Sequence, residues 1–159
     1  MTPPVIHKSF TIERTYPTTA ARVFRALSDP QKKRRWFAEG DGFTVDSYTL
    51  DFTVGGFERA RFRFGEGPPM TTDIVYLDIV TNERVVFAYA MTVGGAPMSS
   101  SLGTMELVPV PSGTLLRLTE HTAFVDGNDG SASRREGSIG LLEALAHELD
   151  PTTERKATS

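Results

Sequence analysis

Glu120 is the residue of this sequence best placed for chemistry. It follows Leu116 and Leu118 at alternate positions of a predicted strand, so the three side chains share one face. The leucines mark that face as the inner one, which directs the Glu120 carboxylate toward the interior. A buried carboxylate is costly unless it is paired with a cation, protonated or next to water. We therefore expect Glu120 to have a structural partner or to serve in ligand binding or acid–base chemistry.

If the role of Glu120 is purely structural, its carboxylate needs a partner within the protein. Arg14 or Arg59 could pair with Glu120, or hydrogen bonds to it could close the loop before the last helix. A bulge in the strand would shift the alternation by one residue and bring His121 inward instead. If the protein is an enzyme, Glu120 and His121 are the candidate catalytic residues.

The remaining polar residues do not have the spacing of a metal site. The histidines His7, His121 and His147 are far apart in the sequence, and only Glu143 and His147 have the i,i+4 spacing of one helix face. That pair predicts a surface interaction, and no third or fourth ligand accompanies it. The sequence therefore predicts no metal.

Several short segments resemble known motifs without matching them. Residues 65–67 lack the third glycine of a dinucleotide-binding loop, and no P-loop motif is present. Residues 126–130 resemble a calcium loop, but Gly137 stands where that loop needs a bidentate acid. Ser138 does not lie in a G-x-S-x-G motif, and there is no cysteine to act as a nucleophile or metal ligand. We expect no cofactor.

Composition restricts the partners and the compartment. The chain has 159 residues, of which 39% are hydrophobic, and a formal charge of -3. This near balance gives no electrostatic footprint for nucleic acid, and no stretch approaches the roughly 20 apolar residues of a membrane span. The N-terminal segment also lacks the apolar core of a signal peptide, so we expect a cytoplasmic protein. A single domain over 1–159 is predicted, with an ordered core over about 7–149 and an unpacked tail over 151–159.

The first elements are predicted from periodicity and from helix-start signals. Residues 7–16 alternate as a half-buried strand, and residues 20–27 have helical spacing behind a cap at Thr18 or Thr19. Asp29 followed by proline then predicts the start of a second short helix.

The second helix carries a basic run. Residues 32–35 fan around the helix at about 100° per residue, so we expect solvated or snorkelling side chains rather than one binding patch. Trp36 and Phe37 supply the apolar anchor.

The middle of the chain predicts an antiparallel meander of six strands. Extended segments from Phe43 to about Phe124 alternate with turn sequences such as Gly55-Gly56 and Pro111-Ser112-Gly113. One face of the fourth extended segment is bulky and carries Val85, Phe87, Tyr89 and Met91.

A long terminal helix follows the meander. Ser133 and Glu136 form a capping-box signature, which predicts a helix that begins there and ends near Leu149. Its apolar stripe is predicted to contain Ile139, Leu142, Leu145, Ala146 and Leu149, with Glu143, His147 and Glu148 off the stripe.

Two segments, one near each end of the chain, resemble the bacterial branch of the heat-shock protein 90 ATPase activator homologue family. FTIERTYPTTAARVFRALSDPQKKRRWF is similar to the family's opening motif, which it matches at Arg14, Tyr16, Val23, Phe24, Ala26, Leu27, Asp29, Pro30, Trp36 and Phe37. LTEHTAFVDGNDGSASRREGSIGLLEALAHEL is similar to its closing segment, matched at Thr119, Glu120, His121, Phe124, Asp126, Gly127, Arg135, Gly137 and Leu142. The resemblance covers about 9–149.

This resemblance implies the helix-grip fold of the SRPBCC superfamily, which includes START and birch-pollen-allergen-like proteins. In this α+β fold, a curved antiparallel seven-strand sheet wraps around a long C-terminal helix, with two short helices after the first strand. Between sheet and helix, proteins of the superfamily hold apolar or aromatic small molecules. The residues expected to wall such a cavity here are Phe24, Leu27, Trp36, Phe64, Phe87, Tyr89, Met91, Leu116, Leu118, Glu120 and Leu142. The alternative is that the same side chains close a solid core.

Three functions remain open from the sequence. The first is non-catalytic binding of a hydrophobic or amphipathic small molecule. The second is a cyclase-like or hydrolase-like enzyme that uses Glu120 or His121. The third, which the family name implies, is a co-chaperone-like adaptor that stimulates a chaperone ATPase. A homodimer is compatible with each of them.

Overall fold

The computed structural model describes residues 1–152 of the chain. The element order is β1 (Ile6–Tyr16), α1 (Ala20–Ser28), α2 (Pro30–Lys33), a π-helical turn η1 (Arg34–Ala38), β2 (Phe43–Leu50), β3 (Phe57–Phe64), β4 (Met70–Val80), β5 (Arg84–Val93), β6 (Ala96–Val110), β7 (Gly113–Phe124) and α3 (Ser131–Leu149). The predicted order of one strand, two short helices, six strands and a long helix is confirmed.

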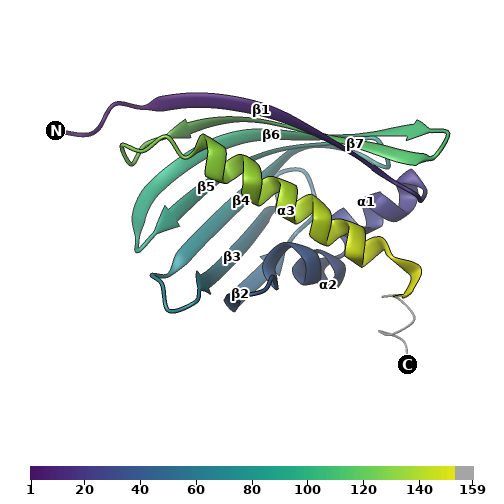
Figure 1. Ribbon diagram of the computed structural model, residues 1–159, viewed down its shortest axis with the longest axis horizontal. Coiled ribbons are helices and arrows are strands. Elements are labelled where there is room, and N and C mark those ends of the chain that lie inside the picture. The colour runs from purple at the N-terminus through teal and green to yellow at the C-terminus, as the bar shows by residue number, and fades with distance from the viewer. Residues whose placement is uncertain (153–159) are drawn as a thin grey trace.

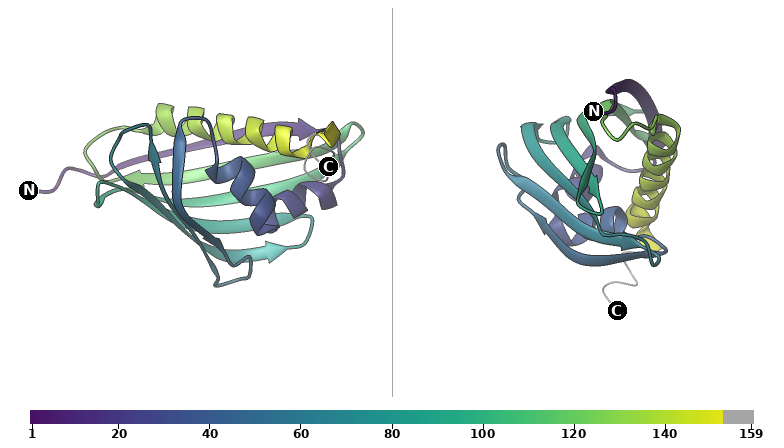
Figure 2. Two further views of the ribbon diagram at one scale, coloured as in Figure 1. Left: turned by 90° about the horizontal axis from the view of Figure 1, so that it is seen from below. Right: turned by 90° about the vertical axis from the view of Figure 1, so that its left-hand side faces the viewer.

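All seven strands form one antiparallel sheet in the order β1-β7-β6-β5-β4-β3-β2. The six later strands pair in sequence order as a meander, and β1 returns to pair with β7 from Tyr16 opposite Thr114 to Ile6 opposite Phe124. Register shifts place one extra residue in each of β2, β4 and β6, and such bulges bend strands and increase their twist. The sheet curls around α3, which crosses its concave face (Figures 1 and 2). This is the helix-grip fold.

The caps of the two short helices are those that the sequence predicts. Thr19 caps α1, and its side chain accepts a hydrogen bond of 3.2 Å from the Arg22 backbone N–H. Asp29 caps α2 by accepting from the backbone N–H groups of Gln31 and Lys32 at 2.9 and 3.1 Å. Pro30 is the first helical residue, where its missing N–H does no harm.

The start of α3 differs from the predicted capping box. The helix begins at Ser131, so Ser133 lies inside the first turn and not at the cap. The N-cap residue is Gly130, which has no side chain to cap the helix, and Asp129 before it accepts a 3.0 Å hydrogen bond from the Ser131 backbone N–H. Arg134 lies on the first turn of the helix.

The core lies where the C-terminal half of α3 meets α1 and the sheet. Leu142, Leu145 and Leu149 are buried as predicted, whereas Ile139 is 40% exposed. Tyr16 ties β1 to this helix, since its hydroxyl donates a buried hydrogen bond of 2.8 Å to the Leu142 carbonyl.

Glu148 was predicted to lie off the apolar stripe, but it is 7% exposed. Its carboxylate accepts two hydrogen bonds from the Arg35 guanidinium, a fork-to-fork pair that fastens α3 to η1. The predicted tail, apart from Pro151 and Thr152, lies outside the described residues. Within the described part of the chain, no helix is long and apolar enough to cross a membrane.

Candidate ligand-binding cavity

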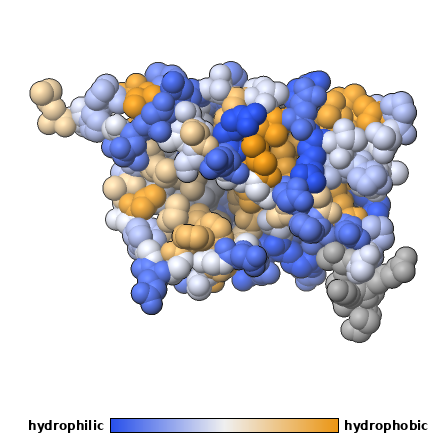
Figure 3. Space-filling model, in the orientation of Figure 1, coloured by the Kyte–Doolittle hydropathy of each residue, from blue (hydrophilic) through white to orange (hydrophobic). Residues whose placement is uncertain are grey.

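A cavity of about 610 Å³ lies between the concave face of the sheet, η1 and the N-terminal half of α3. Apolar side chains gather around a hollow on the face that Figure 3 presents. A volume of this size is in the range that holds a drug-sized ligand. The inner face is therefore not filled by a solid core over its whole length.

Most of the predicted wall residues meet at this cavity. They come from α1, η1, the strands β5 and β7, and α3, and are Leu27, Trp36, Phe87, Tyr89, Met91, Leu118, Glu120 and Leu142.

Three predicted wall residues do not line the cavity. Phe64 is on the inner face at the end of β3, but its side chain is 58% exposed. Phe24 turns toward Phe52 instead, with ring centroids 5.5 Å apart. Leu116 is fully buried in the core, farther along β7 than the cavity reaches.

Three methionines that were not predicted also belong to the wall. Met70, Met98 and Met105 join the predicted Met91 around the cavity. Met105 could have been found from its place on β6, since it pairs with Leu118 of the inner face of β7. Methionine is flexible and polarisable, so these walls suit ligands of differing outline.

Gly103 determines how deep the cavity is. It lies on β6 between Phe87 of β5 and Glu120 of β7. A Cβ at Gly103 would lie 2.4–3.0 Å from three atoms of the Phe87 ring. Only a residue without a side chain lets this ring lie flat on the sheet, which leaves the space above it open.

Gly137 and Gly140 open the opposite wall. Both line the cavity from α3, and a Cβ at either position would meet no atom within 4 Å. The helix therefore does not need these glycines for close approach to the sheet. A side chain at either position would occupy open space along this wall.

Glu120 points into the cavity, as the alternation of β7 predicts, and is 5% exposed. Its Oε1 accepts a 2.5 Å hydrogen bond from the Tyr89 hydroxyl. Within the described part of the chain no group donates to Oε2, which is accessible from the cavity. One carboxylate oxygen is thus free to meet a ligand.

The predicted cation partners of Glu120 are wrong. Arg14 pairs with Glu143 on α3, and Arg59 lies 3.8 Å from Asp73 on the other face of the sheet. The cation near Glu120 is Arg134 of α3, which was not among the predicted partners.

Arg134 is held by neutral hydroxyl groups. It donates to Tyr89 Oη at 3.0 Å, to Ser99 Oγ at 2.7 Å and to Ser101 Oγ at 3.3 Å. Its guanidinium also lies over the rings of Tyr89 and Phe124. These contacts fix the cation at the end of the cavity where Glu120 lies.

Burial raises the pKa of Glu120 above its usual value, and the Tyr89 hydrogen bond and the charge of Arg134 oppose that rise. Burial and the neighbouring carboxylate also raise the pKa of Tyr89, so this phenol stays protonated and remains a donor. The arrangement allows Glu120 to accept a hydrogen bond from a ligand or to exchange a proton with it.

A second polar cluster, which the sequence analysis missed, lies on the opposite side of the cavity. Lys33 belongs to the basic run that was predicted to be solvated, yet it is 6% exposed and lines the cavity. Its Nζ donates to Glu58 Oε1 at 3.1 Å. Glu58 is fully buried and also accepts hydrogen bonds from the hydroxyl groups of Tyr48 and Tyr76.

The histidines do not contribute to this site. His121 is exposed on the outer side of β7, so the slip that would bring it inward does not occur. His147 lies 3.8 Å from Glu143 and is exposed, as predicted for a surface pair. The described residues contain no group of three or more side chains placed to hold a metal ion.

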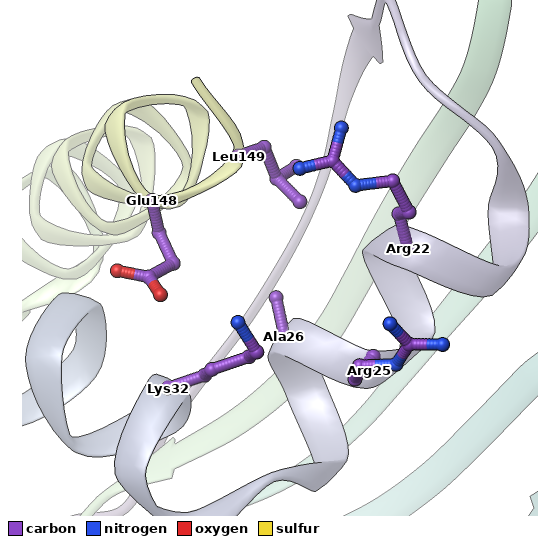
Figure 4. Close-up of a pocket in the computed structure, with 6 residues that line it drawn as sticks. All are labelled: Arg22, Arg25, Ala26, Lys32, Glu148 and Leu149. Carbon is purple, nitrogen blue, oxygen red and sulfur yellow. The ribbon is translucent and has the colours of Figure 1, made fainter. Parts of the chain in front are cut away.

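A second, much smaller pocket lies between α1, α2 and the end of α3 (Figure 4). Arg22, Arg25 and Lys32 face Glu148 and Leu149 around it. Its volume of about 10 Å³ is that of roughly one water molecule. It is too small for an organic ligand.

Solved structures of bacterial proteins resemble this chain over almost its whole length. The Mll3558 protein from Rhizobium loti is 50% identical, with a TM-score of 0.85, over 91% of this chain and 99% of that one. A protein from Rhizobium leguminosarum is 37% identical, with a TM-score of 0.88, over 92% and 96% of the two chains. A search of curated proteins found no match.

The family model described as "Activator of Hsp90 ATPase homolog 1-like protein" matches residues 17–150. This range includes both polar clusters and α3. The chain therefore belongs to the family of activator of Hsp90 ATPase homolog 1-like proteins, with the helix-grip fold that its sequence motifs imply.

Proposed function

We propose that this protein binds a hydrophobic or amphipathic small molecule in the cavity between the sheet and α3. The observation that carries the proposal is the cavity of about 610 Å³, with aromatic and methionine walls and few polar groups. Such a site gains affinity from buried apolar area and orientation from its polar groups. Glu120, with one oxygen free toward the cavity, is the group that orients the ligand.

Native mass spectrometry of gently purified protein, followed by organic extraction, tests this proposal. We expect one small molecule per chain, released into the organic phase. As an independent readout, 6-ethyl-2-naphthol, which has an apolar body and one hydroxyl, should raise the melting temperature. A clean apo mass together with an unchanged melting temperature at saturating probe would contradict the proposal.

Acid–base catalysis in the same cavity is the second candidate, and the raised pKa of Glu120 is the observation that favours it. Glu120 would exchange the proton, with Arg134 to stabilise negative charge on the substrate. His121 has no part in it, because its side chain is outside the cavity. Unchanged turnover of the extracted molecule by a Glu120→Gln variant would remove this role.

An adaptor that stimulates a chaperone ATPase is the third candidate, and the family description supports it. We rank it below the other two because the cavity has no part in it. Chaperone ATP hydrolysis measured with a large molar excess of this protein tests it: stimulation supports the role, and an unchanged rate removes it. A homodimer and a cytoplasmic location remain predictions.

A further inference from the structure

The Lys33 ammonium group has more donors than the protein uses. An ammonium carries three N–H bonds, and the one oxygen that accepts from Lys33 among the described residues belongs to Glu58. The remaining contacts of Nζ are with aromatic rings, at 5.3 Å from the centroid of Trp36 and 4.6 Å from that of Phe37. Lys33, Trp36 and Phe37 all line the cavity.

We propose that Lys33 is a second polar subsite of the cavity and that it receives a neutral carbonyl oxygen of the ligand. This inference rests on the proposed function and adds a ligand class to it. The ligand would be a neutral molecule with an apolar body, a hydroxyl at the Glu120 end and a carbonyl at the Lys33 end.

The charge balance of the cluster favours a carbonyl over a carboxylate. Glu58 already neutralises Lys33 at 3.1 Å, so the pair brings no net charge to the cavity wall. A ligand carboxylate at Nζ would also lie close to the Glu58 carboxylate, and like charges repel strongly at such range in a buried site. A carbonyl oxygen accepts the same hydrogen bond without that repulsion.

The cluster is also fixed in place, which a recognition subsite requires. Hydrogen bonds from Tyr48 and Tyr76 hold Glu58, and Glu58 with the two rings holds the ammonium. The ligand therefore meets a preorganised donor and does not pay to order a mobile lysine.

The two subsites lie on the concave face of the sheet, toward its opposite edges. Glu58 is on β3 and Glu120 on β7, four strand spacings apart, which is roughly 19 Å along the sheet. Because the sheet curls around α3 (Figure 2), the straight line between these two strands is shorter than this arc. An elongated ligand that carries its polar groups at opposite ends fits this arrangement.

Three naphthalene probes test the inference by isothermal titration calorimetry. 6-Acetyl-2-naphthol carries both groups, 6-ethyl-2-naphthol lacks the carbonyl oxygen, and 6-hydroxy-2-naphthoate replaces the carbonyl by a carboxylate. We expect wild-type protein to bind the acetyl probe about tenfold more tightly than the ethyl probe, the effect of one hydrogen bond to a charged donor. The carboxylate probe should bind more weakly than the acetyl probe.

The matched variant is Lys33→Met combined with Glu58→Gln, which removes both charges together and avoids an unpaired buried carboxylate. Its acetyl-to-ethyl affinity ratio should fall to about one, while its affinity for the ethyl probe stays near that of wild type. Lys8→Met, which removes an exposed ammonium on β1, should keep the wild-type ratio.

The outcomes separate this inference from the proposed function. A ratio near one in wild-type protein, a ratio unchanged in the double variant, or a preference for the carboxylate would overturn the Lys33 subsite while binding of the ethyl probe still supports the cavity. If the double variant loses the ethyl probe as well, Lys33 and Glu58 are structural and the subsite is rejected. If wild-type protein binds none of the probes, the proposed function fails too.

Discussion

Glu58 and Glu120 both point from the concave face of one sheet, and both are almost fully buried, yet their surroundings differ. Glu58 accepts hydrogen bonds from Lys33, Tyr48 and Tyr76 and is completely enclosed. Glu120 accepts one, from Tyr89, and its second oxygen is accessible from the cavity. Burial alone therefore does not identify a carboxylate that meets a ligand. The two carboxylates differ in the number of acceptor sites that the protein leaves open.

Of the substitutions that test this comparison, Glu58→Ala has the largest expected effect. The substitution leaves a buried lysine without its counter-ion and two tyrosine hydroxyls without an acceptor. We expect the free energy of unfolding to fall by about 3–5 kcal/mol, measured by urea denaturation. Glu106→Ala, at a half-buried glutamate that pairs with Arg117 at 3.8 Å, is the control and should change it by less than about 1 kcal/mol. Equal effects of the two substitutions would show that the Glu58 cluster is not a closed structural unit.

Gly103→Ala tests how the protein keeps the side of the cavity near Glu120 open. The added methyl group pushes the Phe87 ring away from the sheet and into the cavity. We expect a loss of about 1–3 kcal/mol in stability from overpacking and weaker binding of 6-ethyl-2-naphthol. Gly140→Ala, where a Cβ meets open space, should instead stabilise α3 by about 1 kcal/mol. Full ligand affinity in the Gly103→Ala variant would contradict the assigned role of Phe87.

Glu120→Gln should separate recognition from stability. The amide keeps an oxygen for Tyr89 and removes the carboxylate that accepts from the ligand. We expect a change of less than about 1 kcal/mol in the free energy of unfolding, but about tenfold weaker binding of 6-ethyl-2-naphthol. 2-Ethylnaphthalene, which lacks the hydroxyl, should bind both proteins equally. A larger effect on stability than on affinity would place Glu120 in the same class as Glu58.

The pH dependence of stability has the smallest expected effect, but it reports on Glu120 most specifically. The pKa of Glu120 is raised in the folded protein above the value near 4.5 expected for the unfolded chain. Between these two values the folded state holds a proton that the unfolded state has lost, so the free energy of unfolding falls as pH rises. Relative to Glu120→Gln, wild-type protein should lose stability from about pH 4.5 upward until the raised pKa is passed. Parallel stability curves for the two proteins would show that the carboxylate is well solvated.

The sequence was sufficient to predict the fold and the position of Glu120. Alternation along β7 and the turn sequences between strands depend on local spacing, and local spacing decides which face of a strand is buried. Thr19 and Asp29 cap their helices as predicted because capping needs neighbouring backbone groups alone.

The partners of the two carboxylates could not be predicted in the same way. Lys33 lies among four consecutive basic residues, and helical spacing does not say which of them turns toward the sheet. Its partner Glu58 is 25 residues away and meets it only after the sheet has curled around the helices. Arg134 was missed because it belongs to α3 and meets Tyr89 and Glu120 only after that helix has packed across the sheet.

Substitution of Gly137 tests the central claim, that the space between the sheet and α3 is a ligand site, most directly. Gly137→Ala and Gly137→Leu should both stabilise α3, since alanine and leucine are better helix formers than glycine, but leucine alone fills part of the cavity. Titration of 6-ethyl-2-naphthol should give wild-type affinity for the alanine variant and at least about tenfold weaker binding for the leucine variant. Equal affinity of the two variants for the probe would contradict the account.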